Sequence, residues 1–326
     1  MQDPAATPDW TARRLDPSAQ ALIDQARSLG LPPVHAIPVV QARENSRRAR
    51  ELQQPEAPAV RHVADHVVDR DTAPLRVRHY RARDTAQPQP CLVYFHGGGF
   101  IQGDLESHDV FCRQLSVTLD ASVIAVDYRL APEHPFPAAV TDAVDAVSWA
   151  FRHALPLGID PERLAVGGDS AGANLATVAA LTLAGLAPPI VAQLLLYPVA
   201  DQSRDHPSRT ECAEGYVLTR RALDYYASLY FTDAAQRRDW RASPLLCPDL
   251  SRLPPTLVVT AGFDPLRDEG QAYARRMAKA GVRVDHYCYD GQIHGFATRS
   301  KDVPEALDAI ARSARFLRAR WGTAPT

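Results

Sequence analysis

The chain has 326 residues, of which 46% are hydrophobic and 23% are charged, and its formal net charge is −2. This length and balance suit one large globular domain and exclude a disordered or collagen-like chain. The near-zero net charge also argues against a nucleic-acid binder, because such proteins usually carry a strongly basic face.

Two segments do not follow a regular alternation of strands and helices. Residues 1–55 carry helical patterns over 18–29 and 39–52, joined by the proline-containing sequence LPPVHAIP. Residues 200–245 are polar and irregular at first and have a helical pattern over 219–231. Neither segment has the composition of a linker or a repeat. We therefore expect the two segments to pack together as a lid over the rest of the chain.

In the rest of the chain, short β-rich runs alternate with helical patterns. Strands are predicted over 61–68, 75–82, 91–95, 122–128, 163–168, 189–198, 255–262 and 283–290. Helices are predicted over 108–120, 138–155, 171–186, 269–280 and 305–321. Continuous apolar strands separated by helices are typical of βαβ units, in which a parallel sheet is covered on both faces. The predicted fold class is therefore α/β, with a mostly parallel sheet flanked by helices.

A glycine-rich segment follows the strand expected at 91–95. His96 comes first, followed by three consecutive glycines and Phe100. Without side chains in the way, such a segment can turn its backbone N–H groups towards a ligand. A flexible turn and a phosphate-binding loop are alternatives, but no GxxxxGKS/T or GxGxxG motif follows, which disfavours the phosphate loop. His96 is expected to fix the loop rather than to act as a base.

The sequence GDSAG at 168–172 lies between the strand expected at 163–168 and the helix expected at 171–186. This is the position of a nucleophile elbow, in which a sharp strand-to-helix turn holds a serine, here Ser170, in a strained conformation. The start of the helix also offers unpaired N–H groups and a positive dipole end to a developing anion. G-x-S-x-G occurs by chance, so the position between a strand and a helix carries the prediction.

Asp264 and His294 are the predicted acid and base. Asp264 follows the strand at 255–262, and His294 follows the strand-like run at 283–290. Both therefore lie where loops leave the carboxyl ends of strands, which is the edge at which open α/β sheets bind ligands. The chain order Ser170, Asp264, His294 is the order found in α/β-hydrolases and differs from that of chymotrypsin and subtilisin.

Each of these two residues has a competitor nearby. Asp268 and Glu269 are alternative acids, but both fall in the first turn of the next helix, where carboxylates commonly favour the helix dipole. His286 lies inside the run at 283–290, where we expect it to pack against a neighbour. Asp264 and His294 are therefore preferred.

Together these residues predict a serine hydrolase. His294 accepts the proton of Ser170 as the serine attacks a carbonyl carbon. Asp264 fixes the imidazole tautomer and stabilises the imidazolium without taking the proton. Water activated by His294 then hydrolyses the acyl-enzyme. This chemistry implies neither a metal ion nor an organic cofactor.

An oxyanion hole is predicted beside the serine. Gly97 and Gly98 contribute N–H groups from the glycine-rich segment, and Ala171 contributes the N–H of the residue after the nucleophile. Removing one such donor costs about 10²–10³ in kcat in a comparable serine hydrolase. The hole is therefore as much a part of the predicted machinery as the three side chains.

With these motifs the chain resembles the hormone-sensitive lipase family of α/β-hydrolases, the bacterial family IV esterases, and within it the GDSAG branch. The matching segments are HGGGF (96–100), DYRLAPEHPFPAA (127–139), GDSAGAN (168–174), DPLRDEG (264–270) and HGF (294–296). Ala173 departs from the glycine of many members, with no consequence for the mechanism. The resemblance implies an eight-stranded, mostly parallel sheet with a helical cap. It assigns residues 1–55 to N-terminal cap helices, 56–199 and 246–326 to the catalytic core, and 200–245 to a cap insertion.

The resemblance also implies a serine carboxylesterase that hydrolyses short- to medium-chain acyl esters and forms a homodimer. An amidase or acyltransferase is the alternative within enzymes, because the same acyl-enzyme can form from amides or be intercepted by an alcohol. A ligand-binding protein is disfavoured, because binders have usually lost the serine or the histidine. The acyl-chain preference depends on which cap side chains line the pocket. The candidates are Trp10, Tyr216, Leu218, Tyr225, Tyr226 and Phe231.

Cellular location is predicted from cysteine usage and from apolar runs. The five cysteines are scattered and have neither metal-site nor disulfide-framework spacing, which fits a reducing compartment. The first residues lack the apolar core of a signal peptide, and no window approaches the ~20 apolar residues of a membrane span. We expect a cytoplasmic protein whose partner is a small-molecule ester rather than a nucleic acid or a membrane.

Overall fold

The computed structural model describes residues 13–70, 73–185 and 189–323. Its centre is an eight-stranded sheet in the order β1-β2-β4-β3-β5-β6-β7-β8. The strands are β1 (His62–Val68), β2 (Leu75–Arg81), β3 (Gln89–Phe95), β4 (Ser122–Asp127), β5 (Ile159–Asp169), β6 (Ala192–Leu196), β7 (Thr256–Phe263) and β8 (Val284–Ile293). β2 is antiparallel to both of its neighbours, and the other neighbouring pairs are parallel. The predicted fold class is confirmed.

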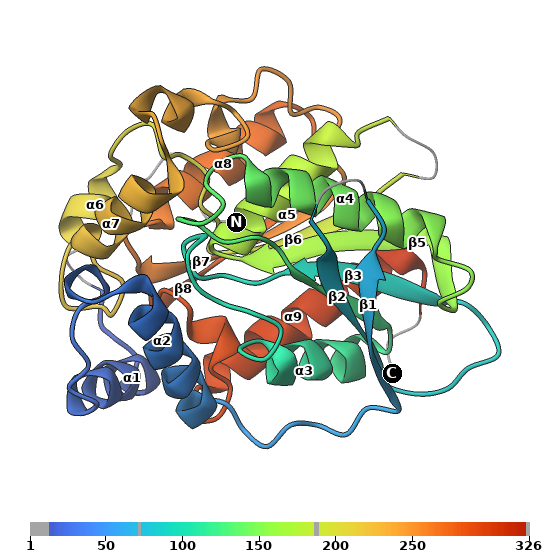
Figure 1. Ribbon diagram of the computed structural model, residues 1–326, viewed down its shortest axis with the longest axis horizontal. Coiled ribbons are helices and arrows are strands. Elements are labelled where there is room, and N and C mark those ends of the chain that lie inside the picture. The colour runs from blue at the N-terminus through green and yellow to red at the C-terminus, as the bar shows by residue number, and fades with distance from the viewer. Residues whose placement is uncertain (1–12, 71–72, 186–188, 324–326) are drawn as a thin grey trace.

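Helices cover both faces of the sheet (Figure 1). The helices of the described residues are α1 (Pro17–Ser28), α2 (Val39–Gln53), α3 (Asp109–Leu119), α4 (Ala138–Arg152), α5 (Ala171–Thr182), α6 (Pro207–Glu211), α7 (Arg220–Tyr230), α8 (Arg267–Lys279) and α9 (Pro304–Trp321). Short 3₁₀ turns are η2 (Val34–Ala36), η3 (Ala234–Arg238), η4 (Pro244–Leu246) and η5 (Phe296–Thr298). Figure 1 shows α4, α5 and α8 on one face of the sheet and α3 and α9 on the other. This is the layering expected of crossover helices between parallel strands.

The central strands have continuous apolar sequences because both of their faces are covered. β3 is buried along its whole length, and β4 is buried except at its last residue. β1, at the edge of the sheet, instead alternates between partly buried and exposed residues. The sequence patterns therefore distinguish the covered centre of the sheet from this edge.

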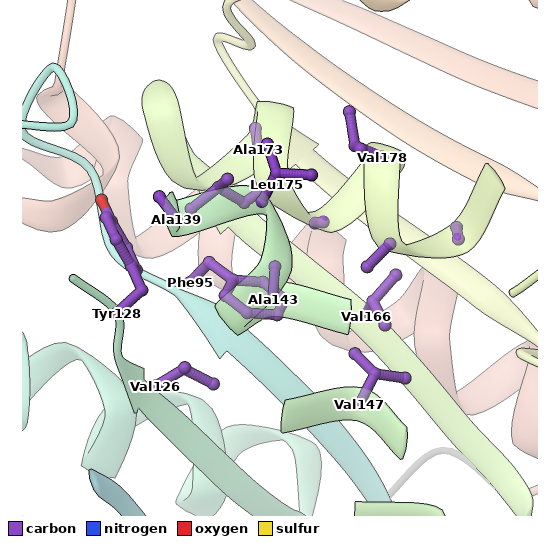
Figure 2. Packing of buried hydrophobic residues seen from close by; sticks show 14 of the residues in the cluster. Phe95, Val126, Tyr128, Ala139, Ala143, Val147, Val166, Ala173, Leu175 and Val178 are labelled. Carbon is purple, nitrogen blue, oxygen red and sulfur yellow. The ribbon is translucent and has the colours of Figure 1, made fainter. Parts of the chain in front are cut away.

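Small side chains bring α4 and α5 close to the sheet. Ala139 and Ala143 on α4, together with Ala173 on α5, are at most 1% exposed. Figure 2 shows them packed with Phe95 and Val166, which lie on the neighbouring strands β3 and β5. This packing fixes the start of α5 directly above the end of β3, where the glycine-rich segment begins.

Several predicted elements differ from the structure at their ends. The helix predicted over 171–186 ends at Thr182, and the one predicted over 138–155 ends at Arg152. The strand predicted over 189–198 spans only Ala192–Leu196, whereas β5 begins at Ile159 and β8 continues to Ile293. Apolar residues continue past the hydrogen-bonded part of an element, so apolar content alone does not locate its last residue.

Helix α2 is tied to the core by charged side chains. Arg43 pairs with Glu133 at 2.7 Å and donates to the carbonyl oxygens of Ile101 and Ala131. Arg47 pairs with Asp104 at 2.5 Å. Figure 1 places α1 and α2 at the same end of the molecule as α6 and α7. Within the described residues, no helix combines the length and the apolar character needed to cross a membrane.

Candidate active site

Ser170 occupies a tight turn between β5 and α5. Its backbone has φ 56° and ψ −117°, a region that L-residues rarely adopt, and its N–H donates to the carbonyl of Leu196 at 2.8 Å. The turn requires glycine on the helix side, because a Cβ on Gly172 would collide with the carbonyl oxygen of Phe95. The strained elbow predicted from the sequence is therefore present, and it directs Ser170 to the carboxyl edge of the sheet.

The structure brings Ser170, His294 and Asp264 together in one hydrogen-bonded chain. The Nε2 atom of His294 lies 3.0 Å from Oγ of Ser170, and its Nδ1 atom lies 2.8 Å from Oδ2 of Asp264. Asp264 is completely buried, and its second oxygen accepts the N–H of Leu266 at 2.7 Å. Tyr197 packs its ring against the imidazole, with 4.7 Å between ring centroids. These contacts hold the imidazole with one nitrogen on the serine and the other on the carboxylate.

The two alternative acids are engaged elsewhere. Asp268 accepts the backbone N–H of Ser208 at 2.8 Å. Glu269 is fully buried, where it accepts the N–H of Ala200 at 2.9 Å and pairs with Arg209 at 3.0 Å. Both carboxylates therefore connect α8 to the segment after β6, and Asp264 is the carboxylate that reaches the histidine.

One predicted oxyanion donor already has a hydrogen-bond partner in the structure. The N–H of Gly97 donates to Oδ1 of Asp169 at 2.8 Å, so this group already has a buried acceptor. The cavity beside Ser170 is lined instead by Gly98 and Gly99. Within the described part of the chain, the N–H groups of these two glycines and of Ala171 have no acceptor. The hydrogen bond of Gly97 thus disfavours its predicted role, and Gly99 has a free N–H group that the sequence did not single out.

Asp169 links the glycine-rich segment to the nucleophile elbow. Besides Gly97, it accepts the hydroxyl of Tyr94 at 2.8 Å and lies 3.4 Å from Nε2 of His108. Burial opposes its ionisation, but His108, Arg50 and Tyr94 outweigh burial and hold the pKa of Asp169 well below its usual range. A buried carboxylate anion therefore fixes the segment from behind.

His96 supports the same segment from the other side. Its Nδ1 atom lies 2.9 Å from the carbonyl oxygen of Gly97, and its ring stacks on Tyr128 with 4.3 Å between centroids. The hydroxyl of Tyr128 donates to the carbonyl of His96 at 2.8 Å. Burial lowers the pKa of His96, which favours the neutral ring. These contacts agree with the expectation that His96 fixes the loop.

A cavity of about 460 Å³ opens onto the serine and the histidine. Ala42, Asn45 and Ala49 of α2 contribute to its lining, as does Ala222 of α7. The two segments that do not follow the strand–helix alternation thus both contribute walls. The carbonyl group of a substrate bound in this cavity would lie between the serine oxygen and the N–H groups of Gly98, Gly99 and Ala171.

Of the six cap side chains predicted to line the pocket, Leu218 and Tyr226 do so. Tyr216 packs against Phe263 instead, and Phe231 packs against the ring of Phe136. Tyr225 is not part of the lining, and Trp10 lies outside the described residues. Whether a cap side chain is aromatic therefore does not predict whether it faces the cavity or packs behind it.

Comparison with known proteins identifies the family. A family model described as the α/β-hydrolase fold matches residues 92–298. The chain belongs to this family. Its resemblance to the hormone-sensitive lipase group within the family is confirmed by relatives that align along most of the chain.

Two of these relatives are similar over nearly their whole length. This α/β-hydrolase is 40% identical to the esterase LipI of Mycobacterium tuberculosis over 277 residues, which cover 83% of this chain and 86% of LipI. It is 40% identical to an ethyl acetate hydrolase of Pseudomonas putida over 296 residues, which cover 89% and 93% of the two chains. A solved ester-hydrolase from the metagenome of Lake Arreo has a TM-score of 0.90 and 39% identity, covering 95% of this chain and 100% of its own.

Some functional groups of this α/β-hydrolase had no signal in the sequence. Tyr94 lies in the strand predicted over 91–95, and His108 begins the helix predicted over 108–120. Both nevertheless contact the buried Asp169. Arg50 and Arg299 also line the cavity, although they lie on α2 and just after η5. Only the folded arrangement brings such distant segments together.

Proposed function

We propose that this α/β-hydrolase is a serine carboxylesterase that cleaves short- to medium-chain acyl esters through an acyl-enzyme on Ser170. The observation that carries the proposal is the hydrogen-bonded chain from Ser170 through His294 to buried Asp264, which opens into a cavity. The names of the relatives, esterase LipI and ethyl acetate hydrolase, place this chain among the carboxylic ester hydrolases.

Acylation begins when Oγ of Ser170 attacks the ester carbonyl carbon. The hydroxyl proton passes to Nε2 of His294, which lies 3.0 Å away. Asp264 keeps Nδ1 protonated and stabilises the imidazolium that forms. When the tetrahedral intermediate collapses, the bond to the alcohol oxygen breaks and His294 returns the proton to that oxygen. The products of this half-reaction are a free alcohol and an acyl-serine.

Deacylation repeats the sequence with water as the nucleophile. His294 removes a proton from water, and the hydroxide adds to the acyl carbonyl. The second intermediate collapses with release of the carboxylic acid, and Ser170 regains its proton from His294. The net reaction consumes one ester and one water and yields one alcohol and one acid.

The negative oxygen of both intermediates is stabilised by backbone donors. We assign this role to the N–H groups of Gly98, Gly99 and Ala171, because each is unpaired within the described residues and lies beside Ser170 in the chain or in the cavity wall. Ala171 is the first residue of α5, so its N–H also belongs to the positive end of that helix. Donors fixed in advance cost no reorganisation when charge develops.

The lid segments are proposed to act as a cap over a catalytic core. Residues 1–55 would supply the wall containing α2, and residues 200–245 would supply the wall containing α7. The core of 56–199 and 246–326 carries Ser170, Asp264 and His294. Support comes from the cavity lining, which includes residues of both segments, such as Ala42 and Leu218.

The experiment is hydrolysis of 4-nitrophenyl esters from acetate to palmitate by the wild type and by Ser170→Ala. The proposal predicts highest kcat/KM at short or medium acyl chains, because a cavity of about 460 Å³ also has to hold the alcohol group. It predicts loss of turnover in Ser170→Ala. Highest activity on palmitate would contradict the chain-length proposal, and full activity in Ser170→Ala would contradict the choice of nucleophile. Amide cleavage without ester cleavage would favour an amidase.

A further inference from the structure

Two arginines from separate segments meet at the wall of the active-site cavity. Arg50 lies on α2, and Arg299 follows η5, five residues after the catalytic histidine. Both line the cavity that contains Ser170 and His294. Arg299 donates to the carbonyl oxygen of His294 at 3.3 Å, so its guanidinium is held against the backbone of the histidine.

Most N–H donors of this pair have no protein acceptor. A guanidinium carries five N–H donors. Arg50 makes one hydrogen bond, to Oγ1 of Thr298 at 3.1 Å, and Arg299 makes the one to His294. Nε of Arg299 is buried and has no partner among the residues that the structure describes. Neither arginine forms an ion pair within residues 13–70, 73–185 and 189–323.

Arg209, another arginine in the cavity wall, shows the contrasting arrangement. Its guanidinium pairs with Glu269 at 3.0 Å and with Asp205 at 3.7 Å, so its charge is balanced by the protein. Such pairing is the usual condition for a charge removed from water. Arg50 and Arg299 lack it, which leaves excess positive charge facing the cavity.

One acidic residue of the lining, Asp169, offsets the charge of the two arginines only in part. Its single negative charge attracts both guanidiniums, but its hydrogen bonds go to Tyr94 and Gly97, and within the described residues it forms an ion pair with neither arginine. Asp224 lies 3.9 Å from Arg220. Burial, and next the charge of Arg50, lower the pKa of Arg299 to about 10, so the guanidinium of Arg299 remains charged near neutral pH.

We propose that Arg50 and Arg299 form a carboxylate-binding subsite, and that the enzyme prefers esters carrying a free carboxylate to neutral esters of similar length. A planar guanidinium edge matches a carboxylate through paired hydrogen bonds, and two unpaired guanidiniums in one cavity supply more donors than a neutral substrate can use. The inference rests on the proposed esterase function, since it names the substrate class of the same site.

The test compares charged and neutral ester pairs. Monoethyl adipate carries the carboxylate in its acyl part and is compared with ethyl hexanoate. 4-Acetoxybutanoate carries it in its alcohol part and is compared with butyl acetate. Proton release at constant pH gives kcat/KM for each ester. We expect one charged ester to exceed its neutral partner by about tenfold or more, as hydrogen bonds between charged groups allow. The pair that shows this preference identifies the side of the scissile bond on which the carboxylate is held.

Variants test whether the arginines cause the preference. Arg50→Gln and Arg299→Gln should each lower the charged-to-neutral ratio of kcat/KM about tenfold. Arg299→Lys retains the charge but loses the planar fork, so its ratio should be intermediate. Arg48→Gln is the matched control, because Arg48 is exposed on the same helix and lies outside the cavity lining. This control should keep the wild-type ratio.

The outcomes separate this inference from the esterase proposal. If the wild type hydrolyses the neutral esters as well as the charged ones, or if the arginine variants keep the ratio, the subsite is disproved and the esterase proposal stands. If no ester is hydrolysed, calorimetric titration of Ser170→Ala with monoethyl adipate and with 4-acetoxybutanoate decides the matter. If Ser170→Ala binds one of these esters and the double variant Ser170→Ala/Arg299→Gln does not, the subsite is supported. If Ser170→Ala binds neither ester, the subsite is overturned.

Discussion

At the scale of single residues, Asp169 has a distinct task from Asp264. Asp264 touches the histidine, whereas Asp169 holds the glycine-rich segment through Gly97 and receives the hydroxyl of Tyr94. Asp169 is therefore a positioning residue for the N–H groups of Gly98 and Gly99. Its negative charge strengthens both hydrogen bonds, because bonds to an ionised acceptor are about twice as strong as neutral ones.

Asp169→Asn tests this role. The amide keeps the shape but loses the charge, so the segment should be held less firmly where the oxyanion forms. We expect kcat on a short-chain ester to fall about tenfold while KM changes by less than about threefold. The reason is that weaker hydrogen bonds to the oxyanion destabilise the transition state more than the bound substrate. Steady-state kinetics on folded protein provide the measurement. Asp302→Asn, at an exposed position, is the control and should keep the wild-type kinetics. If Asp169→Asn weakens substrate binding as much as it lowers kcat, a positioning role is contradicted.

The sequence was sufficient to single out Ser170, Asp264 and His294, which the structure brings together, but not the pattern of free N–H groups around them. Ser170, Asp264 and His294 each follow a strand of the sheet, and the carboxyl ends of parallel strands meet at one edge. Gly97 and Gly99 have no such distinguishing position, because adjacent glycines look alike in sequence. The carboxylate of Asp169 accepts the N–H of Gly97 and thereby leaves the other N–H groups of the segment free. Asp169 lies 72 residues after Gly97, on β5.

At the scale of elements, the contact between β3 and α5 fixes the geometry of the elbow. Gly172 lies in the first turn of α5, against the end of β3, so close that a methyl group there would overlap the carbonyl of Phe95. Phe95 itself is completely buried and cannot move into open space. The separation of this helix and strand is thus set by the absence of a side chain.

Gly172→Ala should therefore push α5 away from β3. We expect the free energy of unfolding to fall by about 2–3 kcal/mol, in the range for overpacked interiors, and ester hydrolysis to fall with it because Ser170 moves. Urea unfolding measures the first effect. Gly215→Ala is the control, since a Cβ there meets nothing and adds only the backbone strain of its positive φ, about 1 kcal/mol. A Gly172→Ala protein as stable as the wild type would refute the close contact.

The order of the elements was easier to predict than their ends or the cap. Apolar runs such as CLVYF and SVIAVD marked central strands because both of their faces are covered. In the cap, Tyr226 faces the cavity, whereas Phe231 packs behind it. Both are aromatic residues of the helical pattern over 219–231, so only tertiary packing distinguishes them.

At the scale of the whole molecule, buried histidines make stability depend on pH. His79 and His108 are each 1% exposed. Burial lowers the pKa of His79 to about 3 and that of His108 to about 4. An unfolded histidine titrates near pH 6.5, so between about pH 6.5 and 4 the unfolded chain binds protons that the folded chain does not.

The free energy of unfolding should therefore fall as the pH drops through that window. Each histidine contributes a slope of about 1.4 kcal/mol per pH unit where only its unfolded form is protonated. Urea unfolding at several pH values between about 7 and 4.5 measures the slope. His79→Gln should make it shallower, whereas His134→Gln, at an exposed position, should not. Constant stability across the window would contradict the burial of neutral histidines.

Ser170 is the proposed nucleophile, and His294 is proposed to activate it. The most direct measurement is labelling with a 4-nitrophenyl alkylphosphonate, followed by mass spectrometry of peptides. A phosphonate that bonds to the serine oxygen and loses 4-nitrophenolate mimics the tetrahedral intermediate. We expect one label per chain, on the peptide containing Ser170, with matching loss of ester hydrolysis and much slower labelling in His294→Asn. A label on another residue, or ester hydrolysis that persists in fully labelled protein, would contradict this role of Ser170.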